Sequence, residues 1–228
     1  MSARVALVAG IFCGIAALAA SLGAAYWLLL PERFPVRELR ISGSLKNTTR
    51  AEIEAALPRA AGNFFAADLG ALRAGVERLP WVRRVAVRRV WPGGIEVSIE
   101  EHVAIARWGD DALVNAHGER FVARTKDHPL PSFIGPAGTS AEVARRYRRF
   151  AEIAAPLGSA IERVVLSPRH AWQLRLANGL HLVLGRDADL AEQRLRRFVE
   201  VYPTMQRKKH EYVDLRYPNG FALRTPES

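Results

Sequence analysis

Residues 79–108, LPWVRRVAVRRVWPGGIEVSIEEHVAIARW, decide the fold of the first globular part of this 228-residue chain. Pro80 ends any helix before it, because proline lacks an N–H and its ring clashes with the preceding turn. On both sides of Pro92-Gly93-Gly94, apolar residues alternate with polar ones, which is the pattern of two half-buried strands joined by a turn. The segment therefore predicts a β-hairpin with one apolar face.

The polar face of this hairpin carries opposite charges on its two strands. If the strands are antiparallel neighbours, the Arg84 and Arg88 row faces the row that Glu96 and Glu100 form. Such cross-strand pairs favour that register modestly. Val87 alternates with the arginines, so we expect it on the buried face, where an introduced charge should unfold the unit.

Two tryptophans flank the first strand of the hairpin. We expect Trp81 and Trp91 to belong to the core and to pack against the helices that precede the hairpin. Exposed aromatic rings at these positions would instead indicate a docking surface.

A strand and two helices precede the hairpin. The strand spans residues 36–41, and Thr49-Arg50-Ala51-Glu52 is a capping-box pattern that opens a helix ended by Pro58. Asp68 is a good N-cap for a second helix, which continues to Pro80. Its apolar residues recur at helical spacing: Leu69, Leu72, Val76 and Leu79. The order strand, helix, helix, strand, strand predicts a three-stranded sheet with both helices on one face, since this buries the apolar stripes.

The amino-terminal end contains a run of 26 uncharged residues from Val5 to Leu30. As a helix this run rises about 39 Å, which exceeds the hydrocarbon core of a bilayer, about 30 Å thick. Tyr26 and Trp27 lie near one end, where amphipathic rings favour the headgroup level. Small residues near Ala20 imitate a cleavage site, but the apolar run of a signal peptide spans only about 7–15 residues. The length favours an uncleaved transmembrane anchor.

The charges that flank this run leave its orientation nearly balanced. Arg4 precedes the run, and Arg33 and Arg37 follow it. Long following domains translocate largely regardless of charge, so we expect a cytoplasmic amino terminus with the remaining residues exported. Cys13 is the only cysteine and lies inside the run, so no intramolecular disulfide can form.

The formal net charge is +10. In a cytoplasmic protein this charge would indicate nucleic acid, whereas in an exported one it fits anionic headgroups, acidic partners or cell-wall polymers. Solubility alone explains it equally well. The arginine runs 83–84, 88–89 and 145–149 belong to a strand or helix with a separate apolar side, which favours solvated faces over a nucleic-acid surface.

A second region begins near His102. Strands are predicted at residues 104–108, 112–115, 119–122, 161–166, 172–176 and 180–184. Asn178-Gly179 joins the last two and is a strong hairpin signal. Residues 129–138 are rich in proline and glycine and indicate a loop.

Two helices are predicted in this region. The first opens at a second capping box, Thr139-Ser140-Ala141-Glu142, and ends at Gly158. Its apolar stripe contains Val143, Tyr147, Phe150, Ile153 and Leu157. The second has Asp189 as its N-cap and ends at Pro203. Its inward residues are predicted to be Leu190, Leu195, Phe198, Val199 and Tyr202.

Known catalytic and metal-binding patterns do not occur in the sequence. The six histidines form no i, i+4 pair, and no HExxH, CxxC, G-x-S-x-G, Walker or GxGxxG motif is present. They are His102, His117, His128, His170, His181 and His210. Asp110-Asp111 follows Gly109 between two short strands, which favours a turn over an acid–base pair. We expect no enzymatic activity, cofactor or metal site.

Three groups of residues form more specific sequence motifs. The segment 79–108 combines a Leu-Pro-Trp-Val start, a Val-x-Val-Arg-Arg strand, a Trp-Pro turn and an Ala-x-Ala-Arg-Trp end. The others are Leu113-Val114-Asn115 with Gly118 and Phe121, and Tyr212-Val-Asp-Leu-Arg-Tyr217 followed by Gly220. Together these groups resemble the FtsQ/DivIB family of bacterial cell-division proteins.

The resemblance implies an α+β fold in two exported parts. A POTRA domain with the order β-α-α-β-β is expected at residues 35–101, and a mixed β domain with two helices at residues 102–224. A cytoplasmic tail, residues 1–4, and a transmembrane helix, residues 5–30, precede them. The implied protein crosses the bacterial inner membrane once, has its bulk in the periplasm and works at the division septum.

The same resemblance implies a non-enzymatic scaffold. Such a protein binds FtsB and FtsL through its periplasmic region, meets other membrane proteins of the divisome and helps control septal peptidoglycan synthesis. Nucleic acid and cofactors are not implied. The residues alone leave two other classes open: an envelope cell-wall-binding protein or enzyme with a cryptic site, and a membrane-tethered nucleic-acid binder.

The expected binding site lies at the end of the chain. Residues 212–217 are predicted to form a strand, with Val213, Leu215 and Tyr217 on one face. As the last long strand it can lie at a sheet edge and accept a partner strand, or it can pair internally with residues 221–223 as a terminal hairpin. The resemblance favours the edge, because the matching family strand receives FtsB.

Seven residues are expected to carry this contact: Tyr212, Leu215, Arg216, Tyr217, Gly220, Phe221 and Leu223. Arg216 would pair with a carboxylate of the partner, and Tyr217 would provide a buried aromatic anchor. Gly220 would let two backbones approach closely.

Overall fold

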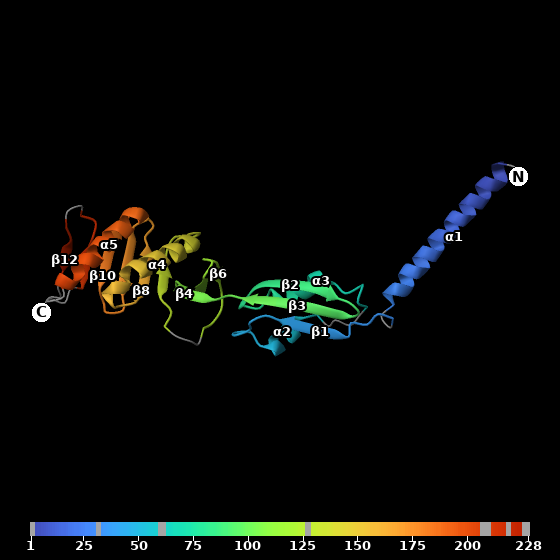
Figure 1. The fold of residues 1–228 in the computed structure, drawn as a ribbon, viewed down its shortest axis with the longest axis horizontal. Helices are drawn as coiled ribbons and strands as arrows, with labels where there is room; N and C mark the ends of the chain where they lie inside the picture. The colour runs from blue at the N-terminus through green and yellow to red at the C-terminus, as the bar shows by residue number, and fades with distance from the viewer. Residues whose placement is uncertain are drawn as a thin grey trace. The chain divides into compact units, whose positions relative to one another are not determined.

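The computed structural model describes residues 3–30, 33–58, 63–125, 129–205, 211–217 and 220–224. The contacts divide the chain into two compact units, residues 1–101 and 102–228. Figure 1 shows an amino-terminal helix, a small sheet with two helices and a larger sheet with two longer helices. The α+β class is therefore confirmed. Two of the six histidines, His128 and His210, lie outside the described residues.

Helix α1 spans Ala3–Leu29. Its segment Val8–Leu28 has a mean hydropathy of 2.0 and is long and apolar enough to cross a membrane. At about 1.5 Å per residue the helix rises about 40 Å, which exceeds the hydrocarbon core of a bilayer.

The first unit contains a three-stranded sheet in the order β1-β3-β2. Strand β1 (Glu38–Ser42) runs parallel to β3 (Gly94–Glu101), and β2 (Val82–Val90) runs antiparallel to it. Helices α2 (Arg50–Ala56) and α3 (Leu69–Val76) lie between β1 and β2 in the sequence. The predicted order strand, helix, helix, strand, strand is confirmed.

Helices α2 and α3 cover the same face of the sheet. Ile53 of α2 and Val76 of α3 have no exposed surface, and they belong to one core cluster with β2 and β3. The strand residues of that cluster are Val82, Val85, Ile95, Val97 and Ile99. Val87 lies on the same face but is only partly buried, so Val85 is the better probe of this core.

The predicted caps of α2 and α3 form. Thr49 accepts a hydrogen bond from the Glu52 amide, 3.2 Å, and its own amide donates to the Glu52 carboxylate, 2.7 Å. Asp68 accepts from the Ala71 amide at 3.0 Å. Helix α3 nevertheless ends at Val76, earlier than predicted. After Val76, tighter turns replace the α-helix, because the Leu79 amide donates three residues back, to the Val76 carbonyl, at 3.1 Å.

The hairpin register agrees with the charge pattern. Arg88 is opposite Glu96 and bonds it at 2.7 Å, and Arg84 is opposite Glu100. The Glu100 carboxylate, however, pairs with Arg83. A register irregularity between Val82 and Arg84 displaces the intervening arginine from the simple alternation.

Trp91 contradicts its predicted place in the core. Its side chain is 67% exposed, whereas Trp81 at the other end of β2 is partly buried. Trp91 immediately follows β2 and begins the turn into β3, beyond the last core valine of the strand. A flanking position therefore places the ring at the end of the sheet and not beneath it.

The second unit contains a mixed sheet of nine strands within the described residues. Its order is β12-β11-β10-β9-β8-β7-β4-β5-β6. The strands β4–β7, β7–β8 and β10–β11 pair in parallel, and the others pair antiparallel. The strands are β4 (Ala104–Trp108), β5 (Ala112–Asn115), β6 (Arg120–Phe121), β7 (Ser132–Ile134), β8 (Ile161–Leu166), β9 (Trp172–Leu176), β10 (His181–Gly185), β11 (Tyr212–Asp214) and β12 (Ala222–Arg224).

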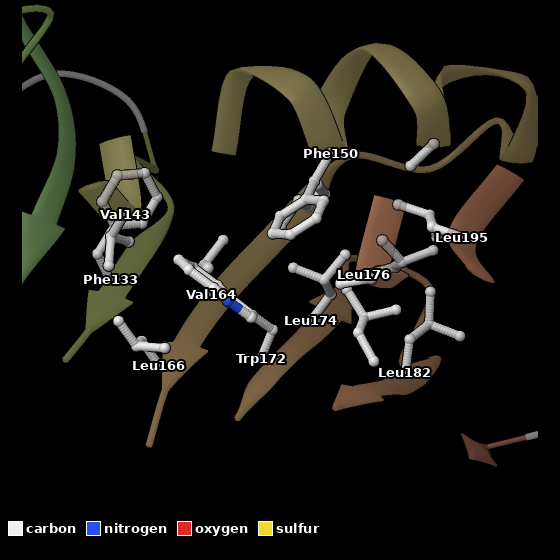
Figure 2. Packing of buried hydrophobic residues seen from close by; sticks show 14 of the residues in the cluster. Phe133, Val143, Phe150, Val164, Leu166, Trp172, Leu174, Leu176, Leu182 and Leu195 are labelled. Atoms are coloured by element: carbon white, nitrogen blue, oxygen red, sulfur yellow. The ribbon is translucent and has the colours of Figure 1, made fainter. Parts of the chain in front are cut away.

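Two helices pack their apolar stripes on this sheet. Helix α4 (Ser140–Ala154) continues as the 3-10 turn Ala155–Leu157, and α5 spans Ala188–Met205. Figure 2 shows Phe150 of α4 directed toward Trp172 of β9, and their ring centroids are 5.5 Å apart. Both side chains are fully buried, so they hold the helix layer on the sheet.

The ends of these helices differ from the prediction. The Thr139 hydroxyl donates to the Pro136 carbonyl at 2.8 Å, so it forms no side-chain cap for α4. Asp187, and not Asp189, accepts the first amides of α5, at 2.9 Å. Pro203 lies inside α5 and does not end it. Leu190, predicted inward, is 43% exposed because it lies in the first turn, ahead of the buried stripe.

Two further predictions for this unit need correction. Residues 132–134 form β7, which pairs with both β4 and β8, although the whole segment was expected to be a loop. Arg146 does not lie on a purely solvated face. It bonds Glu192 at 2.7 Å and Asp189 at 2.9 Å, and thereby joins α4 to α5.

Candidate functional site

The predicted edge strand at the end of the chain is internal. Strand β11 pairs in parallel with β10 on one side and antiparallel with β12 on the other. It also ends at Asp214, so the predicted continuation to Tyr217 is wrong. The terminal hairpin, the alternative that the sequence left open, is the observed arrangement.

Strand β12 is one of the two edges of the described sheet, and β6 is the other. The Leu215 amide donates to the Val183 carbonyl of β10, and the Glu211 carbonyl accepts from His181 of the same strand. The backbone N–H and C=O groups of a strand point to alternate sides from one residue to the next. Those of Val213 therefore point to the same side as those of Glu211 and Leu215, toward β10. Leu223 pairs with Val213 in the β11–β12 ladder, so its N–H and C=O point away from β11 toward the open edge.

The Leu223 side chain extends a buried row across the sheet. Directly opposed residues share a face, and Leu223 is followed inward by Val213, Leu182 and Leu174 in successive strands. The three inner residues are buried, whereas Leu223 is 43% exposed. The row therefore lacks a neighbour on one side at the edge.

Phe221 fixes the chain where it enters β12. Its ring lies 5.7 Å from that of Phe198 in α5, edge to face, and the side chain is half-buried. A Cβ on Gly220 would meet no described atom within 4 Å. The close backbone approach predicted for this glycine is therefore not one that the described chain makes with itself.

Asp214 and Arg216 form a clamp beside the edge. The Arg216 guanidinium donates to the carboxylate at 2.6–3.0 Å, and its backbone amide donates to the same group at 3.0 Å. These hydrogen bonds lower the pKa of the Asp214 carboxyl. The Asp214 side chain is 7% exposed and that of Arg216 is 58% exposed. A carboxylate from a partner would have to share an arginine that is already paired.

The remaining predicted contact residues differ in accessibility. Leu215 is fully buried and presents no side-chain surface to a partner. Tyr212 is half-buried, with its ring 5.3 Å from that of His181, whose pKa is lowered by burial and by the charge of Arg175. Tyr217 is 54% exposed.

The sequence argument missed two edge residues. Ala222 and Arg224 flank Leu223 in β12, and both are exposed. The alternation of residues 221–224 was too short to show which side of this strand is open. Among the described residues, no three His, Cys, Asp or Glu side chains are grouped to hold a metal ion.

The comparisons with known proteins agree with this architecture. Residues 106–216 match the family model "Cell division protein FtsQ/DivIB, C-terminal", and residues 34–102 match "POTRA domain, FtsQ-type". The chain is similar to the cell division protein FtsQ of Burkholderia pseudomallei, with 43% identity over 207 residues, 87% of this chain and 83% of that protein. It is 34% identical to the FtsQ protein of Escherichia coli K12 over 209 residues, 86% of this chain and 75% of that protein.

Proposed function

Because this chain belongs to the FtsQ/DivIB family of cell-division proteins, we propose that it is a divisome scaffold that binds FtsB at the open edge of β12. In this proposal FtsL joins the same complex, and the complex helps control septal peptidoglycan synthesis. The scaffold performs no chemistry of its own. The observation that carries the proposal is the outward-facing backbone of Leu223.

A partner strand added to β12 would form both backbone hydrogen bonds and side-chain contacts. It would pair with the free N–H and C=O groups of the edge, which is the usual mode of β-augmentation. It would also place a side chain next to Leu223 and continue the apolar row of Val213 and Leu182. A strand with an apolar residue at that register position is therefore the expected partner.

The charges at this edge favour an acidic partner. Arg224 is exposed on β12, and the whole chain carries a net charge of +10. Complementary charge speeds association and fixes register more than it adds affinity. Arg216 contributes less than the sequence predicts, because Asp214 already neutralises it.

The decisive test is Leu223→Pro, which removes the outward N–H. Proline is tolerated on an edge strand when its N–H side faces solvent, so the fold should persist. Leu223→Val is the matched control, because it keeps the N–H and an apolar side chain. Binding of the periplasmic part of FtsB should be lost in the proline variant and kept in the valine variant.

Equal binding by both variants would show that β12 does not receive the partner strand. Tyr217→Ala provides a second, side-chain test at an exposed ring. Arg216→Glu is a poor test, since it would place two carboxylates side by side at the clamp.

We further propose that the amino terminus is cytoplasmic and that the residues after α1 are periplasmic and reach the division septum. The support is one long apolar helix within the described residues, followed by a POTRA fold and a second compact unit, in a chain of a cell-division family. A fluorescent protein that matures only in the cytoplasm, fused after Ser228, should remain dark. A bright fusion would refute the orientation.

The first unit is proposed to serve recruitment through its POTRA fold. Deletion of residues 35–101 should reduce septal localisation more than it reduces FtsB binding to the second unit. Normal septal localisation of the deletion protein would assign recruitment to another part of the chain.

A further inference from the structure

Aromatic side chains gather at the end of the first unit where β2 turns into β3. The Phe34 ring centroid lies 5.2 Å from that of Phe65 and 6.4 Å from that of Trp91. Phe64 contacts both of the latter rings and is itself buried. Phe65 and Trp91 are 42% and 67% exposed, so this aromatic end presents two large rings outward.

The aromatic end is joined directly to the end of α1. The Asn63 side-chain amide donates to the carbonyls of Leu28 and Leu30, at 2.6 and 2.8 Å. Its oxygen accepts from the Phe65 amide at 2.7 Å. Asn63 is 1% exposed, so one buried side chain binds two carbonyls at the end of α1 and also holds the Phe65 loop.

A ring contact makes the same connection. Trp27 of α1 lies 6.2 Å from Phe34, edge to face. The Phe65 and Trp91 rings are therefore only two ring contacts from a tryptophan near the end of the apolar helix. The covalent chain also keeps the two parts close, because the five residue-to-residue steps from Leu29 to Phe34 span at most about 18 Å.

The loop that carries Phe65 is held in place by Arg89 of β2. Its guanidinium donates to the carbonyls of Phe64, Phe65 and Ala67, at 2.7–3.1 Å. The Phe64 amide donates to the Phe34 carbonyl at 2.6 Å. Polar backbone groups beside the exposed rings are thus satisfied within the unit.

We propose that Phe65 and Trp91 insert into the boundary between headgroups and acyl chains of the membrane that α1 spans. The amphipathic ring of Trp91 favours that level, the apolar ring of Phe65 favours its acyl side, and α1 is long enough to carry Trp27 to it. Arg33 and Arg37 are exposed in the connecting segment, and Arg33 lies 5.2 Å over the Trp27 ring. These cations match anionic headgroups.

Insertion of these two rings would hold the sheet and helices that carry them at a fixed depth relative to the bilayer surface. The unit then does not move freely on a flexible linker, because the aromatic end and Asn63 both bind it to the helix terminus. The partner in this proposal is lipid, since continuity with α1 brings the rings to the bilayer surface without any other protein.

The test uses the full chain in lipid nanodiscs made with brominated lipid, which quenches tryptophan at the acyl boundary. The Trp27→Phe background removes the helix tryptophan and keeps an aromatic ring. Among the four tryptophans that remain, Trp108 and Trp172 are buried in the second unit. Trp81 lies ten residues from Trp91 along β2, about 30 Å away.

Brominated lipid should remove up to about a quarter of the emission of this background, the share of one tryptophan among four. A further Trp91→Phe change should abolish the quenching, whereas Trp81→Phe, the matched control, should leave the lost intensity unchanged. Circular dichroism checks that each variant is folded. An unquenched background, or quenching that survives Trp91→Phe, would overturn the proposal.

Discussion

Replacing Asp214 should weaken the second unit even though it removes no apolar contact. The Asp214→Ala variant loses an acceptor for the Arg216 amide and for the Arg216 guanidinium. A hydrogen bond to a charged group is worth about 1.5–3 kcal/mol. The ion pair itself adds only about 0–1 kcal/mol, because the Arg216 side chain is 58% exposed. We expect a loss of about 2 kcal/mol in the free energy of unfolding.

The matched control is Asp214→Asn, which keeps the shape and one acceptor oxygen but removes the charge. We expect it to lose about 1 kcal/mol at neutral pH. The folded pKa of Asp214 lies below the unfolded value of about 3.9, since Arg216 favours the ionised form. The contribution of the charge is therefore complete above about pH 4 and is lost as the pH falls through the folded pKa.

The assay is urea unfolding of a fragment that begins at residue 33, followed by tryptophan fluorescence and circular dichroism. Trp172 is buried in the second unit and reports on its unfolding. The difference between the parent and Asp214→Asn should shrink at pH values below the folded pKa. An Asp214→Ala variant within about 0.5 kcal/mol of the parent at neutral pH, or a pH-independent difference, would refute the reasoning.

Three other substitutions test the packing. Gly75→Ala should destabilise the first unit by about 1–2 kcal/mol, because its Cβ would overlap the Ala56 carbonyl oxygen of α2. Gly70→Ala in the same helix should cost less, because its Cβ would meet only the Asp68 carboxylate oxygen, at 3.1 Å, and alanine favours the helix; thermal unfolding compares the two. Val85→Asp, at a 2% exposed position, should unfold the unit at a cost of several kcal/mol, and a native circular dichroism spectrum would contradict its place in the core. Arg146→Met should cost about 1–2 kcal/mol in urea unfolding because two carboxylates of α5 lose their partner, and the exposed control Arg145→Met should cost less than about 0.5 kcal/mol.

Local patterns predicted the first unit well because its elements are contiguous and strongly punctuated. The capping box at Thr49 and the alternation of Ile95, Val97 and Ile99 both refer to neighbours close in sequence. Trp91 was misplaced for a different reason. Its ring occupies the end of the sheet, and whether such a position is covered depends on residues 34 and 64–65, far away in the chain.

Some strands of the second unit are too short for a sequence pattern to identify them. Strand β7 has three residues between Pro131 and Gly135, and only Phe133 among them is buried. No period can be read from one buried residue, so the parallel pairing with β4 and β8 that makes it a strand had no local signal. Helix α5 also departs from the local preference, because it continues two residues past Pro203, to Met205.

At the candidate site, the strand pattern and the family resemblance identified the region but not the edge. Within the predicted strand 212–217, only Tyr212–Asp214 forms a strand of the terminal sheet, and a two-fold alternation cannot tell an internal strand from an outer one. That choice depends on whether the last residues fold back, and Phe221 does so by packing on Phe198. The open edge of the described sheet at this end is consequently β12 and not β11.

Amide hydrogen exchange at Leu223, with and without the periplasmic part of FtsB, tests the central claim most directly. In the free protein the Leu223 amide should exchange fast, while the flanking amides of Ala222 and Arg224, which face β11, should exchange more slowly. In the complex the Leu223 amide should become at least about tenfold slower, because it then donates to the added strand. A complex that forms while Leu223 continues to exchange at its free rate would contradict β-augmentation at this edge.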